Sequence, residues 1–80
     1  MNALLEMRKR IDEIDARVVR LLEVRFKIAK NVGIEKRLLG LPVRNSKREA
    51  EVLAKVKECD HPAQMENVFK KIMAESRSLQ

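Results

Sequence analysis

The chain has 80 residues and a formal net charge of +6, with 45% hydrophobic and 38% charged residues but only two phenylalanines, two glycines and two prolines. This composition is typical of one small all-α domain and excludes a sheet protein, and so short a chain has little capacity for a core of its own. No apolar stretch is long enough to cross a bilayer, and a single cysteine cannot form an intrachain disulfide. We therefore expect a cytoplasmic protein without membrane contact.

The positive charge is concentrated in one segment of the chain. Residues 25–48 contain eight basic residues and one acidic residue, a net charge of +7. Such a concentrated positive field predicts an anionic partner, either a metabolite or a nucleic acid. The lone His61 has only Cys59 and Asp60 as neighbours of a metal-ligand type, so no metal site is expected.

Apolar residues recur at alternating steps of three and four, which predicts a first helix over about residues 3–38. Gly40 and Pro42 end the pattern. The first-helix seam, the line of residues on this face, consists of Leu4, Met7, Ile11, Ile14, Val18, Leu21, Arg25, Ile28 and Val32. Such a helix is about 50 Å long, whereas a compact chain of this size has a radius of gyration of only about 12 Å. The rest of the chain cannot cover it, so we expect an intertwined homodimer.

Two shorter helices are predicted to follow. Ser46, with Glu49 three residues later, has the pattern of a capping box and opens a helix over about 46–58. Pro62 suits a first helical position and opens a third helix over about 62–79. The apolar face of the third helix consists of Met65, Val68, Phe69, Ile72, Met73, Ser76 and Leu79. Residues 1–80 are therefore expected to form one domain of three helices.

Several polar residues stand where the helical pattern asks for apolar ones. Arg25 is on the first-helix seam, and Lys36 follows at about 20° of rotation and ~16 Å along the axis, so both can reach one ligand. Arg8 lies about 25 Å before Arg25 and ~100° around the helix, so it can serve such a site only from a second, antiparallel chain. Further candidates in the other two helices and before them are Arg44, Arg48, Glu49, Ser76 and Gln80.

Each candidate also has an ordinary structural explanation. Arg25 can pair with a glutamate of a neighbouring helix, and Lys36 can be a solvated lysine at a helix end. Ser76 can bond to a carbonyl of the preceding turn. Glu49 is accounted for by the capping box, and Gln80, the last residue of the sequence, by a frayed helix end. Taken together, however, they bring cations and neutral donors to one region with few acids, which favours a site for a small anion.

Four spaced motifs run through the chain. They are R-x-x-I-D-x-I-D from Arg8, R-x10-K from Arg25, P-V-R-x-x-x-R-E from Pro42 and S-x-x-x-Q from Ser76. With these motifs the chain closely resembles the all-helical chorismate mutases along nearly its whole length. The resemblance implies a dimer of three-helix chains whose long first helices are shared between two sites. It also implies an isomerase of phenylalanine and tyrosine biosynthesis, which converts the dianion chorismate to prephenate by a Claisen rearrangement without a cofactor.

The resemblance assigns binding and catalytic roles to the cations. Arg25 and the partner's Arg8 would bind the two substrate carboxylates, since forked guanidinium donors suit bidentate capture. Lys36 would donate to the ether oxygen and to a carboxylate, and Gln80 would be the second donor to the ether oxygen. Because Gln80 ends the sequence, either its donor is held less rigidly than the others or the chain is a cut or engineered form of something longer.

The resemblance also implies a subsite for the ring hydroxyl. Glu49 would accept a hydrogen bond from that hydroxyl, and Arg48 would orient the substrate and this acid. Asn45 stands where family members often have an aspartate near the hydroxyl, and an amide can still bond there. Ser76 would contact a carboxylate.

Three other functions compete with the mutase. An isochorismate-pyruvate lyase has the same fold, but the Arg48–Glu49 pair and the proline-led "PVRNSKRE" favour the mutase. A basic helical nucleic-acid-binding dimer would explain the charge, but several cations lie on the seam and the chain lacks stacking aromatics, so no nucleic-acid partner is expected. A purely structural coiled coil explains neither Arg25 on a seam nor Ser76 on an apolar face.

Overall fold

The computed structural model describes residues 2–80, which form three α-helices and no strand. The all-α prediction is confirmed. Helix α1 spans Ala3–Leu39, α2 spans Ser46–Val56 and α3 spans Pro62–Leu79. Helix α1 thus ends one residue later than expected, and α2 ends two residues earlier. None of these helices is both long and apolar enough to span a membrane.

Helix α1 is long and is capped at both ends. The Asn2 side chain accepts hydrogen bonds from the backbone N–H of Leu4 and Leu5, at 2.9 and 3.3 Å, and so satisfies two of the free donors of the first turn. At the other end Gly40 adopts a left-handed conformation with φ 68°. The N–H of Leu41 then bonds to the Lys36 carbonyl at 2.8 Å, closing the last turn.

The start of α2 corrects one expectation from the sequence. The N-cap is Asn45 rather than Ser46, and its side-chain oxygen accepts from the Arg48 N–H at 3.0 Å. The predicted capping box between Ser46 and Glu49 is therefore wrong. The cap satisfies a first-turn donor of α2 without Glu49, which leaves the carboxylate of that residue to make other contacts.

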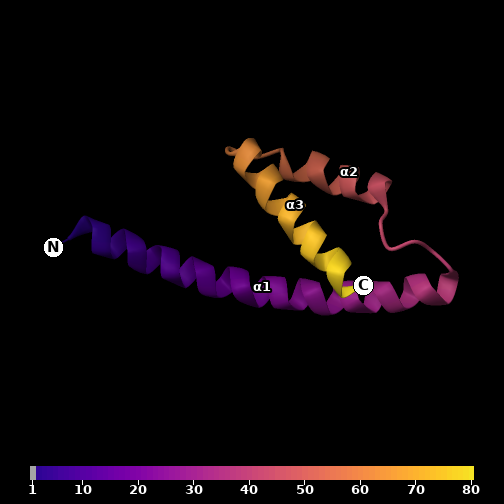
Figure 1. Cartoon of the computed structure of the whole chain (residues 1–80). Coiled ribbons are helices and arrows are strands. Elements are labelled where there is room, and N and C mark those ends of the chain that lie inside the picture. Colours follow the sequence, from indigo (N-terminus) through magenta and orange to yellow (C-terminus); the bar gives the residue numbers. More distant parts are fainter. Residues whose placement is uncertain (1) are drawn as a thin grey trace.

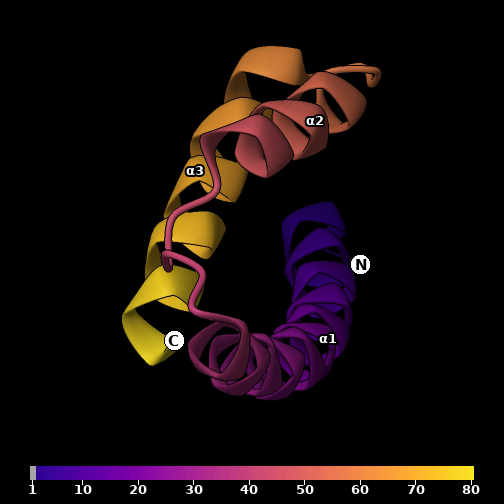
Figure 2. The ribbon, with the colours of Figure 1, turned by 90° about the vertical axis from the view of Figure 1, so that its right-hand side faces the viewer.

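Helix α3 packs against both other helices, whereas α2 and α1 do not pack against each other. Helix α3 runs diagonally and ends over the C-terminal half of α1, while α2 lies on the far side of α3 (Figure 1). Seen along α1, the other two helices and the 40–45 connection arch over one side of that helix (Figure 2). The candidate site is lined by residues of all three helices and of the 40–45 connection.

Ion pairs stabilise the corner between α2 and α3, which is the 57–61 connection together with the helix ends that it joins. The Glu66 carboxylate lies 3.3 Å from the Lys57 ammonium, which follows α2, and 3.4 Å from the Lys70 ammonium in α3. The hydrogen bond from Lys57, together with that from Lys70, lowers the pKa of the Glu66 carboxyl below its ordinary value. The charged form of Glu66 is therefore favoured by folding.

A single chain buries very little apolar surface. Along the α1–α3 contact only Ala29, Gly33, Met73 and Ser76 are buried. The apolar residues of the first-helix seam are all 40–71% exposed. The molecule measures 59 × 23 × 14 Å with a radius of gyration of 16.1 Å, against about 12 Å for a compact chain of this length. As expected from its length, α1 is not covered by the rest of its own chain.

Candidate active site

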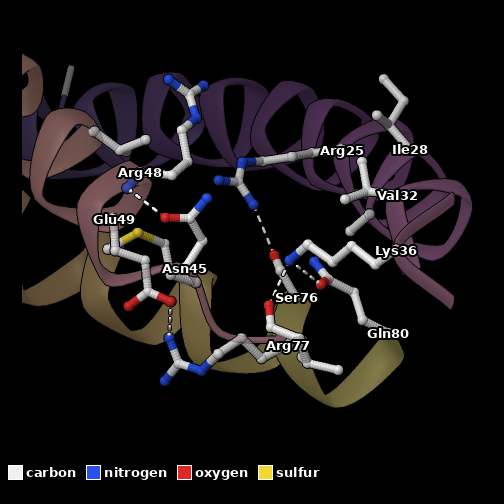
Figure 3. Close-up of a pocket in the computed structure, with 14 residues that line it drawn as sticks. Arg25, Ile28, Val32, Lys36, Asn45, Arg48, Glu49, Ser76, Arg77 and Gln80 are labelled. Atoms are coloured by element: carbon white, nitrogen blue, oxygen red, sulfur yellow. Dashed lines mark hydrogen bonds and ion pairs between the residues drawn. The ribbon is translucent and has the colours of Figure 1, made fainter. Parts of the chain in front are cut away.

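A cavity of about 420 Å³ lies between the C-terminal half of α1, the first turns of α2 and the last turns of α3 (Figure 3). Its volume is within the range of small-molecule sites. Six apolar residues form part of its wall: Ile28, Ala29, Val32, Val43, Val52 and Met73. The polar lining consists of Arg25, Lys36, Asn45, Arg48, Glu49, Ser76, Arg77 and Gln80. Seven of the nine candidate residues from the sequence therefore meet around one cavity, whereas Arg8 and Arg44 do not line it.

Arg25 reaches across the cavity from α1 to α3 (Figure 3). One of its guanidinium nitrogens, Nη1, donates to Ser76 Oγ at 2.6 Å, and Ser76 Oγ donates in turn to the Ile72 carbonyl at 2.7 Å. Ser76 is 6% exposed, so this contact is well enclosed. No carboxylate within residues 2–80 pairs with Arg25. The guanidinium, with five N–H donors, retains donors for a ligand in the cavity.

Lys36 is held from two sides. Its ammonium donates to Gln80 Oε1 at 2.8 Å and to the Val43 carbonyl. An ammonium has three N–H donors, so one remains for a ligand. The side chain is half-buried. Lys36 is therefore not the freely solvated helix-end lysine that the sequence left open.

Gln80 is fixed more firmly than its place in the sequence suggested. Besides the Lys36 contact, its backbone carbonyl accepts from Arg37 Nη1 at 2.7 Å, and its N–H bonds to the Arg77 carbonyl at 3.1 Å. Its backbone also lies directly against Gly33 of α1. These contacts argue against the alternative of a frayed helix end. Because its side-chain oxygen accepts from Lys36, the amide N–H groups are left to donate.

Glu49 is the acid of the cavity, and its contacts differ from those expected. Its Oε2 accepts from Arg77 Nη1 at 2.6 Å, while Oε1 lies 3.9 Å from Arg44 Nη2. Arg48, expected to orient this acid, pairs instead with Glu51 at 3.6 Å on an exposed surface. Arg77 was absent from the sequence-based candidates because a charged residue beside an apolar helical face looks like a solvated one. Its partner on α2 becomes apparent only when α2 and α3 are packed.

Asn45 combines a structural role with a place in the lining. Its Oδ1 caps α2 through the Arg48 N–H, and its side chain faces the cavity next to Arg48 and Glu49 (Figure 3). The amide nitrogen is not used by the cap. It can therefore still contact a ligand in this part of the cavity.

Two candidates do not line the cavity: Arg44, whose exposed guanidinium lies 3.9 Å from the Glu49 carboxylate, and Arg8. Arg8 lies in α1, seventeen residues before Arg25, which is about 25 Å along the helix. Its side chain is exposed and takes no part in the lining. Within one chain, Arg8 is thus remote from the seven candidates that line the cavity.

The charge of the cavity is positive. Four cations line it, namely Arg25, Lys36, Arg48 and Arg77, against the single carboxylate of Glu49. That carboxylate is already paired with Arg77. Cations in a partly apolar, partly closed cavity attract anions more strongly than they do in open water. The arrangement can bind a small anion with carboxylates and can place lysine and amide donors beside one of its oxygen atoms.

Comparison with known proteins agrees with this chemistry. Residues 7–80 match the model of a family described as chorismate mutase type II. A chorismate mutase from Methanocaldococcus jannaschii is 34% identical over 73 residues, which are 90% of this chain and 74% of that protein. A bifunctional chorismate mutase/prephenate dehydratase from Aquifex aeolicus is 43% identical over 56 residues. That match covers 70% of this chain but 16% of the bifunctional protein, so the chain corresponds to a small part of its length.

A solved structure shares the fold. The structure of a conserved hypothetical protein from Pyrococcus furiosus superimposes with a TM-score of 0.84 and 34% sequence identity, over 99% of this chain and 97% of that one. The family match covers nearly all of the described residues and includes every candidate site residue. The chain belongs to the chorismate mutase type II family, whose members are isomerases of aromatic amino-acid biosynthesis.

Proposed function

We propose that this chain catalyses the rearrangement of chorismate to prephenate. One observation carries the proposal: an arginine, a lysine and a neutral amide meet around a cavity of about 420 Å³ whose single acid is already paired. Chorismate is a small dianion, so it needs cations for its two carboxylates. It also needs an uncharged wall for its ring, which the apolar lining supplies.

The reaction breaks a C–O bond and forms a C–C bond within one molecule. No nucleophile and no general base takes part, so catalysis consists of holding a compact conformer and stabilising charge where it develops. The C–O bond breaks ahead of C–C formation and leaves partial negative charge on the ether oxygen. Lys36 and Gln80, whose side chains are 2.8 Å apart, are suited to donate to that oxygen together. Their mutual bond and the Val43 contact hold the lysine in place before the substrate arrives.

The remaining donors fit the binding of the substrate. Arg25 would bind one carboxylate by its free donors, and Ser76, buried against the guanidinium, would fix its direction. For Ser76 to contact the same carboxylate, its hydroxyl hydrogen would turn to it from the Ile72 carbonyl. Glu49 would accept from the ring hydroxyl, with Asn45 and Arg48 nearby in the lining.

A homodimer with an antiparallel partner would complete the site. The exposed apolar seam of α1 gives a second chain a surface to cover, and the partner's Arg8 would supply the cation for the second carboxylate. The reducing cytoplasm is the proposed location, in keeping with the exposed free thiol of Cys59.

Direct assay tests the proposal. The purified chain is incubated with chorismate, the loss of chorismate absorbance is followed, and the products are identified. Lys36→Ala removes a donor from the developing oxyanion, and loss of such a donor lowers kcat by about 10²–10³-fold. We expect Lys36→Ala to lose at least that much, and Arg25→Ala to lose kcat/KM mainly through weaker binding.

A matched control shows whether the loss of activity in Lys36→Ala comes from its place in the cavity or from the loss of a positive charge anywhere in the chain. Lys55→Ala removes an exposed lysine of α2 outside the cavity and should leave kcat and KM unchanged. A folded chain inert toward chorismate would contradict the proposal. Salicylate and pyruvate formed from isochorismate would replace it with the lyase, and retention on polyanions that falls steeply with salt would favour nucleic-acid binding.

A further inference from the structure

The ion pair between Arg77 and Glu49 differs from the other ion pairs within residues 2–80. It is the shortest, at 2.6 Å, and the most enclosed, with side chains 29% and 18% exposed. The others measure 3.1–3.9 Å, and each has a partner at least 49% exposed. Exposed pairs of that kind contribute little, whereas a short, enclosed, charge-assisted contact fixes the geometry of both side chains.

Both members of this pair line the cavity, and they come from the two helices that form one side of it. Figure 3 shows the Arg77 guanidinium below Glu49, with the acid between it and the part of the cavity next to Asn45. Arg77 engages only one carboxylate oxygen, Oε2. The other oxygen, Oε1, has a single charged neighbour, Arg44, at 3.9 Å and on an exposed side chain. Oε1 therefore remains able to accept a hydrogen bond from a ligand.

Besides fixing the Glu49 carboxylate in place, Arg77 offsets its negative charge. A carboxylate in a site for a dianion repels its ligand, because like charges at short range in a partly closed cavity are poorly screened. The guanidinium against Glu49 offsets that repulsion. Arg48 cannot do so in this arrangement, since its guanidinium pairs with Glu51 on the surface.

We propose that Arg77 is a positioning residue, which fixes the Glu49 carboxylate and offsets its charge so that Oε1 can accept a hydrogen bond from the substrate hydroxyl. This inference rests on the proposed mutase function. Arg77 itself does not touch the reacting atoms. Its effect is exerted on substrate binding, through Glu49.

The kinetic prediction follows from that role. Arg77→Met keeps a long apolar side chain but removes the charge, which leaves Glu49 unpaired beside a dianion. We expect KM to rise at least tenfold while kcat changes less than threefold, since an interaction with the bound substrate rather than with the transition state is lost. Arg77→Lys keeps a charge and one donor, and should recover most of the parent KM.

A double-mutant cycle identifies the partner. In a Glu49→Gln background the carboxylate is absent, so Arg77→Met should change KM by less than twofold. Lys71→Met is the matched control, because it removes a surface ion pair with Glu75 at 3.1 Å on the same helix, outside the cavity. It should leave both constants within twofold of the parent. Thermal midpoints and circular dichroism of every variant report whether the fold is intact.

The outcomes distinguish this inference from the function on which it rests. A parent chain inert toward chorismate overturns both. An active parent whose folded Arg77→Met variant keeps its KM overturns the role of Arg77 alone. The role of Arg77 is also overturned if Arg77→Met loses activity only in proportion to its unfolded fraction. It is overturned as well if Arg77→Met raises KM by the same factor in the parent and in the Glu49→Gln background. A large KM effect that disappears in the Glu49→Gln background supports the inference.

Discussion

Gln80 lies directly on Gly33. A Cβ atom built on Gly33 would be 2.7 Å from Gln80 Cα and 3.0 Å from its Cβ and its carbonyl oxygen. Carbon atoms in real structures do not approach so closely, so any larger residue at position 33 must displace the end of α3. By helix propensity alone, Gly33 is merely an unfavourable residue inside a long helix. The structure instead makes it the place where α3 comes close enough to α1 for the Gln80 side chain to meet Lys36.

Gly33→Ala is therefore expected to impair catalysis while making α1 a better helix. Alanine favours a helix interior over glycine by about 1 kcal/mol, which works against any loss of stability. Displacing Gln80 removes its contact with Lys36 and its donor to the ether oxygen, so we expect kcat to fall at least tenfold with the chain still folded. The measurement is kcat together with the thermal midpoint.

Asn31→Ala is the matched control for Gly33→Ala. It also improves the helix propensity of α1, but at an exposed position outside the cavity. Its kcat should equal that of the parent. An unchanged kcat in Gly33→Ala would mean that the end of α3 shifts without consequence for the reaction.

Helical periodicity alone was enough to single out Arg25, Lys36 and Ser76. Arg25 and Ser76 interrupt apolar faces, and Lys36 falls on the same side of α1 as Arg25 because eleven residues make nearly three whole turns. Residues on one face of one helix are related by fixed geometry. The structure then adds the contact between Arg25 and Ser76, which joins two helices.

Helical periodicity does not predict which residues of different helices touch. It also does not decide which of two suitable residues is the N-cap of α2. Asn45 and Ser46 are both favourable N-cap residues, and the path of the 40–45 connection decides between them. Arg77 looks like any charged residue at the edge of an apolar face until α2 is placed beside it. Gly33 shows no sign of its close neighbour, which is 47 residues away in the sequence.

The corner between α2 and α3 should weaken in acid. Since the pKa of Glu66 is lower in the folded chain than in the unfolded one, its ion pairs with Lys57 and Lys70 stabilise the fold above the unfolded pKa. That contribution is lost as the pH falls through the folded pKa. Glu66→Gln should thus have a lower denaturation midpoint than the parent at pH 7, and the difference should disappear near pH 2. Glu58→Gln, which removes an exposed acid without such partners, should follow the parent at both pH values.

The first-helix seam should be the surface on which two chains associate. Leu4, Met7, Ile11, Ile14 and Val18 are 44–56% exposed in one chain. Burying an apolar side chain of this size contributes about 1.5–3 kcal/mol. Ile11→Glu and Ile14→Glu are expected to convert a dimer to monomers, seen as a halved mass by sedimentation and as a loss of activity. Lys9→Glu introduces the same side chain about 200° around the helix from residue 11 and should leave the mass unchanged. A monomeric, active parent would contradict the dimer.

Mixing two impaired variants tests whether Arg8 acts on the partner's site. Arg8→Ala should raise KM strongly by removing one carboxylate contact, and Lys36→Ala should abolish turnover. If each site takes Arg8 from one chain and Lys36 from the other, a mixed dimer contains one intact site and one doubly altered site. Random reassembly of equal amounts should then restore about a quarter of the parent activity, because half of the dimers are mixed and half of their sites are intact. If Arg8 has no role in the partner's site, unfolding and refolding the two chains together will yield only the sum of their separate activities.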